Sequence, residues 1–240
     1  MGYVYTGIFL AASALICAMT TIQKASYATS SYFQYMIFAF VVLIPLLTMR
    51  LFSEERKTRT EQLLLTAPVT ITGMVLGKYL AALTIFVSGV LISCINFIPL
   101  YSIAAAERAG TSSSLNHIGP VTGEIVGSLI AVILMGAALI AVGTLISALT
   151  ENQLSAAVVT IAVIAAMVLL SYVNALKDSD GQPIISNYAV RFVIDWVCVM
   201  SRFAAFRNGI FDYSAVLYYV SLAFVFLFLT VRVYEKRRWG

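Results

Sequence analysis

The side chains that could catalyse a reaction or bind a metal are few in this chain and lie far apart in its sequence. Its cysteines, Cys17, Cys94 and Cys198, are isolated, and its single histidine, His117, has no cysteine or second histidine beside it. Metal sites and disulfide frameworks need such residues at short, recurring spacings. We therefore predict no catalytic residue and no metal site, and we expect the thiols to pack as small apolar side chains.

One stretch has a superficial likeness to a phosphate-binding loop. Gly73 and Gly77 precede Lys78, whereas the motif G-x-x-x-x-G-K-[ST] lies between a strand and a helix. The spacing here is one residue too short, Tyr79 replaces Ser or Thr, and no strand precedes the glycines. We therefore reject nucleotide binding within this chain and expect the two glycines to form a small-residue contact between membrane helices.

The densest run of charge in the first hundred residues is Ser53–Pro68, SEERKTRTEQLLLTAP, with apolar segments on both sides. Glu54 and Glu55 would lie in the first turn of a helix, where the helix dipole favours acidic side chains. Ser53 can cap that helix by accepting a bond from a free backbone N–H. We predict a short charged helix over residues 53–67, ended by the proline that follows it.

The composition around this run is that of a membrane protein. Hydrophobic residues make up 61% of the chain and charged residues 11%, and the mean hydropathy is +0.94. A soluble domain has about 25% charged residues, and a helix of about 20 apolar residues crosses the hydrocarbon core. We predict a single all-α transmembrane domain over residues 1–240 with six spans. Their approximate bounds are 2–22, 32–51, 70–101, 121–149, 154–175 and 214–233.

A second segment outside the spans has helical character. Between the fifth and sixth spans, residues 184–207 place Val193, Trp196, Val197 and Met200 at helical spacing on one face, with arginines and an aspartate opposite. Such a segment is amphipathic and too charged to cross the bilayer. We predict an external helix that lies in the membrane interface.

The fourth span carries glycines at every fourth position near its outer end. Gly119, Gly123 and Gly127 share one helical face, and Glu124 lies beside them. Small residues let helices approach closely in lipid, so helix packing is the plain interpretation. The alternative is that Gly123, Gly127 and Glu124 line a transport pathway, because an acidic side chain within a span marks a candidate functional site.

The distribution of basic residues predicts the orientation. With the N-terminus inside, nine of the 15 Lys and Arg residues lie in short inner segments, which agrees with the positive-inside rule. The nine are Arg50, Arg56, Lys57, Arg59, Lys78, Arg232, Lys236, Arg237 and Arg238. The net charge of +4 therefore reflects orientation and contact with anionic lipid headgroups, and we expect no nucleic-acid partner.

The stretch LTMRLFSEERKTRTEQLLLTAPVTITGMVLGKYLAAL resembles the loop of ABC-2-type transporter permeases, especially those of the gliding-motility branch. Two positions depart from the family pattern: Arg59 stands where the family usually has Gly, and Gln62 where it usually has an acid. The segment RFAAFRNGIFDYSAVLYYVSL and the basic C-terminal ending also resemble that branch. The matching positions of the loop are Glu54, Glu55, Arg56, Thr60, Leu63, Leu64, Pro68, Leu76, Gly77 and Lys78.

The resemblance implies a role for the charged helix and a set of partners. In this family the segment is a coupling helix that docks on a separate ATP-binding subunit, which holds the ATP and magnesium, so no cofactor is expected in this chain. The family also implies a second permease subunit, in a homodimer or a heterodimer, and a bacterial plasma membrane with both termini in the cytoplasm. The implied interface is Ser53, Glu54, Glu55, Arg56, Lys57, Arg59, Thr60, Glu61, Leu63 and Leu64.

Two further functions stay open beside ATP-driven export. The chain could anchor an ABC-type machine that passes force to an extracytoplasmic accessory protein without moving a cargo, and residues 176–213 would then bind that protein. It could also be a membrane-embedded enzyme. That alternative is disfavoured because such enzymes need paired acids, a Ser/His pair or a metal cluster within the spans, and the sequence has none.

Overall fold

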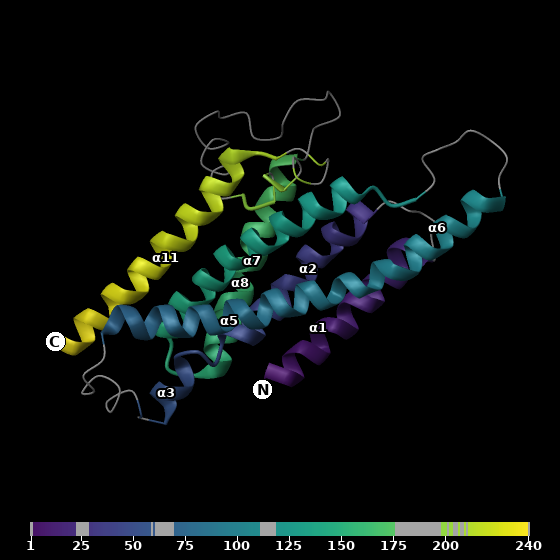
Figure 1. The fold of residues 1–240 in the computed structure, drawn as a ribbon. Helices are drawn as coiled ribbons and strands as arrows, with labels where there is room; N and C mark the ends of the chain where they lie inside the picture. The colour runs from purple at the N-terminus through teal and green to yellow at the C-terminus, as the bar shows by residue number, and fades with distance from the viewer. Residues whose placement is uncertain are drawn as a thin grey trace.

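The computed structural model describes most of the chain as a bundle of helices, and every regular element in the described residues is helical (Figure 1). The described residues are 2–22, 29–58, 60, 70–110, 119–175, 198–200, 202–203, 206, 209 and 211–239. The elements are α1 (Gly2–Cys17), the π-helix η1 (Ala18–Ile22), α2 (Thr29–Thr48), α3 (Ser53–Lys57), α5 (Ile71–Ser93), the 3-10 helix η2 (Cys94–Phe97), α6 (Ile98–Gly110), α7 (Thr122–Leu149), α8 (Gln153–Ala175) and α11 (Tyr213–Trp239).

Six of these helical segments are long and apolar enough to cross a membrane, which confirms the all-α, six-span prediction. The third is the longest, with 36 residues from Ile71 to Ala106, and it combines α5, η2 and most of α6. A span of this length exceeds the hydrocarbon thickness and is accommodated by tilt. Large apolar side chains such as Leu154 and Phe224 are exposed on the outer helices, as a lipid-facing surface requires.

Helix α7 forms the centre of the bundle. It contacts α2, α3, α5, α8 and α11, and 61% of its most apolar window is buried. Two glycines allow these contacts. A Cβ atom on Gly136 would lie 2.2 Å from the ring of Phe86 in α5, and one on Gly143 would lie 2.4 Å from Oγ1 of Thr48 in α2. Only a residue without a side chain leaves room for these neighbours.

Aromatic side chains join the first three spans near α7. The ring centroids of Phe9 and Phe86 are 6.1 Å apart, and those of Phe40 and Phe86 are 5.3 Å apart. All three rings are fully buried. Aromatic pairs at these separations attract one another in addition to their apolar contact. These three rings therefore help to hold α1, α2 and α5 together.

The glycine contact predicted for the start of the third span is not made by the described residues of this chain. No heavy atom of a described neighbour lies within 4 Å of the place where a Cβ on Gly77 would stand. The nearest neighbour of the corresponding position on Gly73 is Oγ1 of Thr70, the residue that directly precedes the same helix. These glycines therefore make no helix–helix contact within the described part of the chain.

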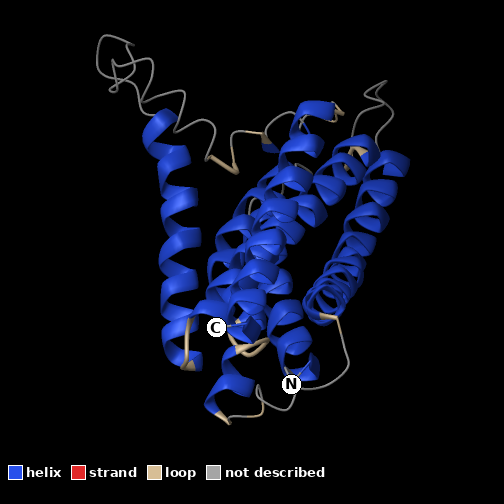
Figure 2. Ribbon diagram, turned by 90° about the vertical axis from the view of Figure 1, so that its left-hand side faces the viewer, coloured by secondary structure: helices blue, strands red, loops and turns tan. Residues whose placement is uncertain are grey.

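Both chain ends lie toward the end of the bundle that carries α3 (Figures 1 and 2). An even number of spans returns the chain to its starting side, so the termini and the α2–α5 connection share one membrane face. The external amphipathic segment predicted at residues 184–207 lies largely outside the described residues and stays a prediction. Of its described residues, Phe203 and Phe206 are buried.

Candidate functional site

The charged segment after the second span forms the short helix α3 at one end of the bundle (Figure 1). The backbone N–H of Arg56 donates to the carbonyl of Phe52 at 3.2 Å, and that of Thr58 donates to the carbonyl of Glu54 at 3.0 Å. The predicted helix covers residues 53–67, but residue 59 and residues 61–69 lie outside the described part. A helix this short is marginal by itself, so its position depends on contacts with other elements.

The start of α3 is capped by a serine from the central helix. Oγ of Ser147, in α7, accepts bonds from the backbone N–H groups of Phe52 at 3.1 Å and Ser53 at 3.3 Å. The first N–H groups of a helix have no partner within the helix and need an acceptor from elsewhere. The prediction that Ser53 caps its own helix is wrong, because its hydroxyl donates to the carbonyl of Met49.

Arg56 ties α3 to the turn between α7 and α8. Its Nη2 forms an ion pair with Oε1 of Glu151 at 2.9 Å, and its Nη1 donates to the carbonyl of Leu149 at 3.2 Å. Leu149 ends α7, where the helix dipole favours a positive charge. Because Glu151 is 73% exposed, the ion pair alone contributes little, about 0–1 kcal/mol. The main effect of the two Arg56 contacts is to fix the position of α3 relative to the end of α7 and the turn before α8.

Lys78 ties α3 to the third span from the other side. Its Nζ pairs with Oε2 of Glu55, donates to the carbonyl of Leu51 at 2.9 Å and lies 4.4 Å from the centroid of the Phe52 ring. Its stem and ammonium are directed to the loop because the carboxylate, a carbonyl and a ring all face it there.

The sixth span completes this arrangement. The rings of Phe52 and Tyr234 pack with centroids 5.0 Å apart, within a buried cluster that also includes Val75 and Ala148. Nη2 of Arg237 donates to the carbonyl of Ala148 at 2.7 Å. We call α3, together with Ser147, Glu151, Lys78, Tyr234 and Arg237, the coupling junction. It joins one short helix to the ends of α5, α7, α8 and α11.

The residues predicted to bind an ATPase subunit fall into three groups. Ser53, Glu55 and Arg56 contact this chain's own spans. Glu54, Lys57 and Thr60 are exposed on the outer side of the segment. The remaining predicted residues lie outside the described part of the chain: Arg59, Glu61, Leu63 and Leu64.

Most of the residues that hold α3 were missed by the sequence predictions. Ser147 has no sequence signal, because it lies 94 residues from Ser53 in an ordinary apolar helix. Glu151 stands in a tight turn whose single acid could have suggested a partner for the basic loop. Lys78 belongs to the matched family pattern, yet that pattern does not show which way its side chain is directed.

The glycines of the fourth span approach the segment that precedes α11. A Cβ on Gly127 would lie 2.8 Å from the carbonyl oxygen of Phe206. Gly209, whose φ of +72° favours glycine, lies against the backbone of Gly123 and Glu124. This geometry supports close packing at Gly127, while a pathway role for Gly123, Gly127 and Glu124 stays a prediction. Within the described residues, no three His, Cys, Asp or Glu side chains could hold a metal together.

The comparison with protein families gives a match over most of the chain. A family model described as "ABC-2 family transporter protein" matches residues 18–234. The match therefore includes every residue of the coupling junction except Arg237. A search of curated proteins found no significant match.

Proposed function

Because the chain belongs to the ABC-2 transporter family, we propose that it is the permease subunit of an exporter driven by ATP hydrolysis on a separate subunit docked at α3. Permeases of this family work with an ATP-binding partner and as dimers. The main support for docking at α3 is that its two sides differ. Its inner side is fastened to four spans, while Glu54 and Lys57 are exposed to a partner.

The contacts of α3 provide a route for force. A partner that displaces α3 would carry with it the Ser147 cap and the Arg56–Glu151 pair, and so the ends of α7 and α8. The Glu55–Lys78 pair would carry the start of α5. Because helices move as rigid bodies, a push at the junction would change their tilt along the whole length of the spans.

The remaining parts of the proposal concern assembly and place. A second permease, either another copy or a different chain, would complete a transport path, and the partner subunit would hold the ATP and magnesium. We place the junction and both termini in the cytoplasm of a bacterial inner membrane. Support comes from Lys236, Arg237 and Arg238, which end α11 on the same face as α3, where the positive-inside rule expects basic residues.

The docking proposal is tested by Glu54→Lys. Like charges brought together in an interface cost several kcal/mol, so we expect the ATPase subunit to co-purify at least about tenfold less well. Glu235→Lys is the matched control, because it makes the same change at the same end of the bundle, where Glu235 pairs with Arg232. Normal co-purification of the Glu54→Lys permease would contradict docking at α3.

Force transmission is tested separately by Glu151→Lys. This substitution breaks the tie between Arg56 and the α7–α8 turn but leaves Glu54 and Lys57 unchanged. We expect the ATPase subunit to bind normally while transport per ATP hydrolysed falls. Unchanged transport would show that the route through Glu151 carries no force.

A further inference from the structure

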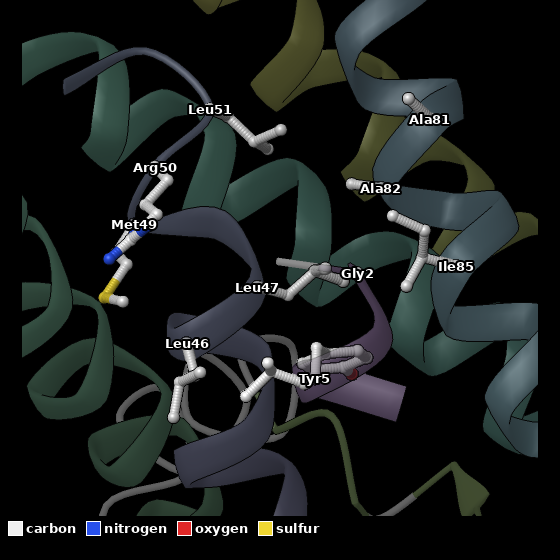
Figure 3. Close-up of a pocket in the computed structure, with 11 residues that line it drawn as sticks. Gly2, Tyr5, Leu46, Leu47, Met49, Arg50, Leu51, Ala81, Ala82 and Ile85 are labelled. Carbon is white, nitrogen blue, oxygen red and sulfur yellow. The ribbon is translucent and has the colours of Figure 1, made fainter. Parts of the chain in front are cut away.

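A cavity of about 330 Å³ lies beside the coupling junction, between the start of α1, the end of α2 and the middle of α5 (Figure 3). This volume is at the lower end of the range for small-molecule sites, roughly 300–1,000 Å³. Gly2 and Tyr5 come from α1, and Ala82 and Ile85 come from α5. Leu46 and Leu47 of α2 line it with the residues that lead into α3, namely Met49, Arg50 and Leu51.

Two polar groups among these apolar walls lack partners. Tyr5 is 3% exposed, and its hydroxyl has no hydrogen-bond partner within the described part of the chain. The buried Nε of Arg50 likewise has none there, and Arg50 forms no ion pair with a described acid. A buried polar group without a partner is destabilising. The Arg50 guanidinium can only donate, so a ligand that pairs with it must supply acceptors.

The positions of Arg50 and of the apolar lining residues match one class of ligand. Arg50 follows the end of the second span, Ser31–Thr48, and lies at one edge of the cavity, away from Ala82 and Ile85 (Figure 3). Leu47 and Ile85 belong to the apolar part of the wall. A cation at the edge of the cavity and an apolar wall complement a phosphate and an acyl chain.

We propose that this cavity binds one anionic phospholipid from the leaflet at the α3 end. The lipid phosphate accepts from the Arg50 guanidinium, and one acyl chain lies along α2 and α5. Anionic lipids gather at basic residues of this kind on the inner face. Since the carbonyls of Met49 and Leu51 accept from Ser53 and Lys78 of the junction, the bound lipid contacts the turn that carries α3.

A second groove in the same bundle provides a matched control. It has a volume of about 260 Å³ and lies between α5 and α11, with apolar walls and Arg232 among its lining residues. Here the arginine is already neutralised, because Nη1 of Arg232 pairs with Oε2 of Glu235 at 2.7 Å and its guanidinium lies 5.0 Å from the Phe228 ring. The two sites therefore differ in whether the cation has a partner of its own.

The test measures lipid binding to the full-length permease by native mass spectrometry, with phosphatidylglycerol and phosphatidylcholine as the probes. We expect the wild-type chain to keep one phosphatidylglycerol in preference to phosphatidylcholine. Arg50→Gln should weaken that binding roughly tenfold or more, as expected for a lost charged hydrogen bond, whereas Arg232→Gln should leave it unchanged.

A cavity-filling variant separates the acyl chain from the charge. Ala82→Phe keeps Arg50 but occupies the apolar wall, and it should also lose the lipid, while inorganic phosphate alone should not compete. Circular dichroism melting of each variant shows whether it is folded. Equal binding of the two lipids, equal loss in Arg232→Gln, undiminished binding in folded Ala82→Phe, or full competition by phosphate would each overturn the proposal. This readout needs no ATPase subunit, so its failure is distinct from failure of the docking proposal.

Discussion

At the scale of single residues, the coupling junction depends on side chains that come from distant parts of the sequence. Oγ of Ser147 accepts from two backbone N–H groups at the start of α3. Lys78 meets a carboxylate, a carbonyl and an aromatic ring in one place. Neither residue type is unusual in a membrane protein. Their importance comes from the polar backbone groups that they satisfy where α3 meets the bundle.

Substitution of Ser147 tests this cap. We expect Ser147→Ala to lower the free energy of unfolding by about 1–2 kcal/mol, because a helix cap is lost and two buried N–H groups are left without an acceptor. The measurement is thermal melting, together with faster amide hydrogen exchange in α3. Ser155→Ala is the control, since Ser155 is exposed and bonds only within its own turn. Equal effects of the two substitutions would argue against a cap at Ser147.

At the scale of elements, glycines decide how closely α7 packs against its neighbours. The sequence predicts long apolar helices and marks glycine-rich faces, but it does not show which glycines lie in contacts. Gly136 packs directly against Phe86, whereas Gly77 has open space around it. The difference arises because α7 is surrounded by other helices, while this side of α5 faces away from them.

This difference predicts opposite effects of the same substitution. Gly136→Ala should destabilise the bundle by about 1–3 kcal/mol, because the added methyl group forces Phe86 to move in a packed core. Gly77→Ala should be neutral or slightly stabilising, since alanine is the better helix former by about 1 kcal/mol. Melting temperatures of the purified proteins in one detergent provide the comparison. A lower melting temperature for Gly77→Ala than for Gly136→Ala would contradict the packing described here.

At the scale of the whole molecule, the even number of spans brings α3 and both termini to one membrane face. This arrangement makes the junction accessible from a single compartment. It also places the basic end of α11 beside the loop between α2 and α5, where Tyr234 packs on Phe52. The distribution of basic residues predicts that this face points toward the cytoplasm.

Cysteine labelling tests the orientation. In a background without the three native cysteines, we expect Lys57→Cys and Lys236→Cys to react with a membrane-impermeant reagent only from the cytosol. Asp180→Cys should react only from outside. Both lysines are exposed, so access is not limited by packing. Reaction of either lysine position from the outside would reverse the proposed topology.

The sequence by itself determined the class of the protein, the number of spans and the family, because apolar length and a charged loop motif are local properties of the chain. The gliding-motility branch and the helix beyond Lys57 remain predictions. Tertiary structure alone decided the partners of α3: the cap from Ser147, the pair with Glu151 and the inward direction of Lys78. Each of these contacts joins residues far apart in sequence, and no local pattern shows which groups face one another once the helices pack.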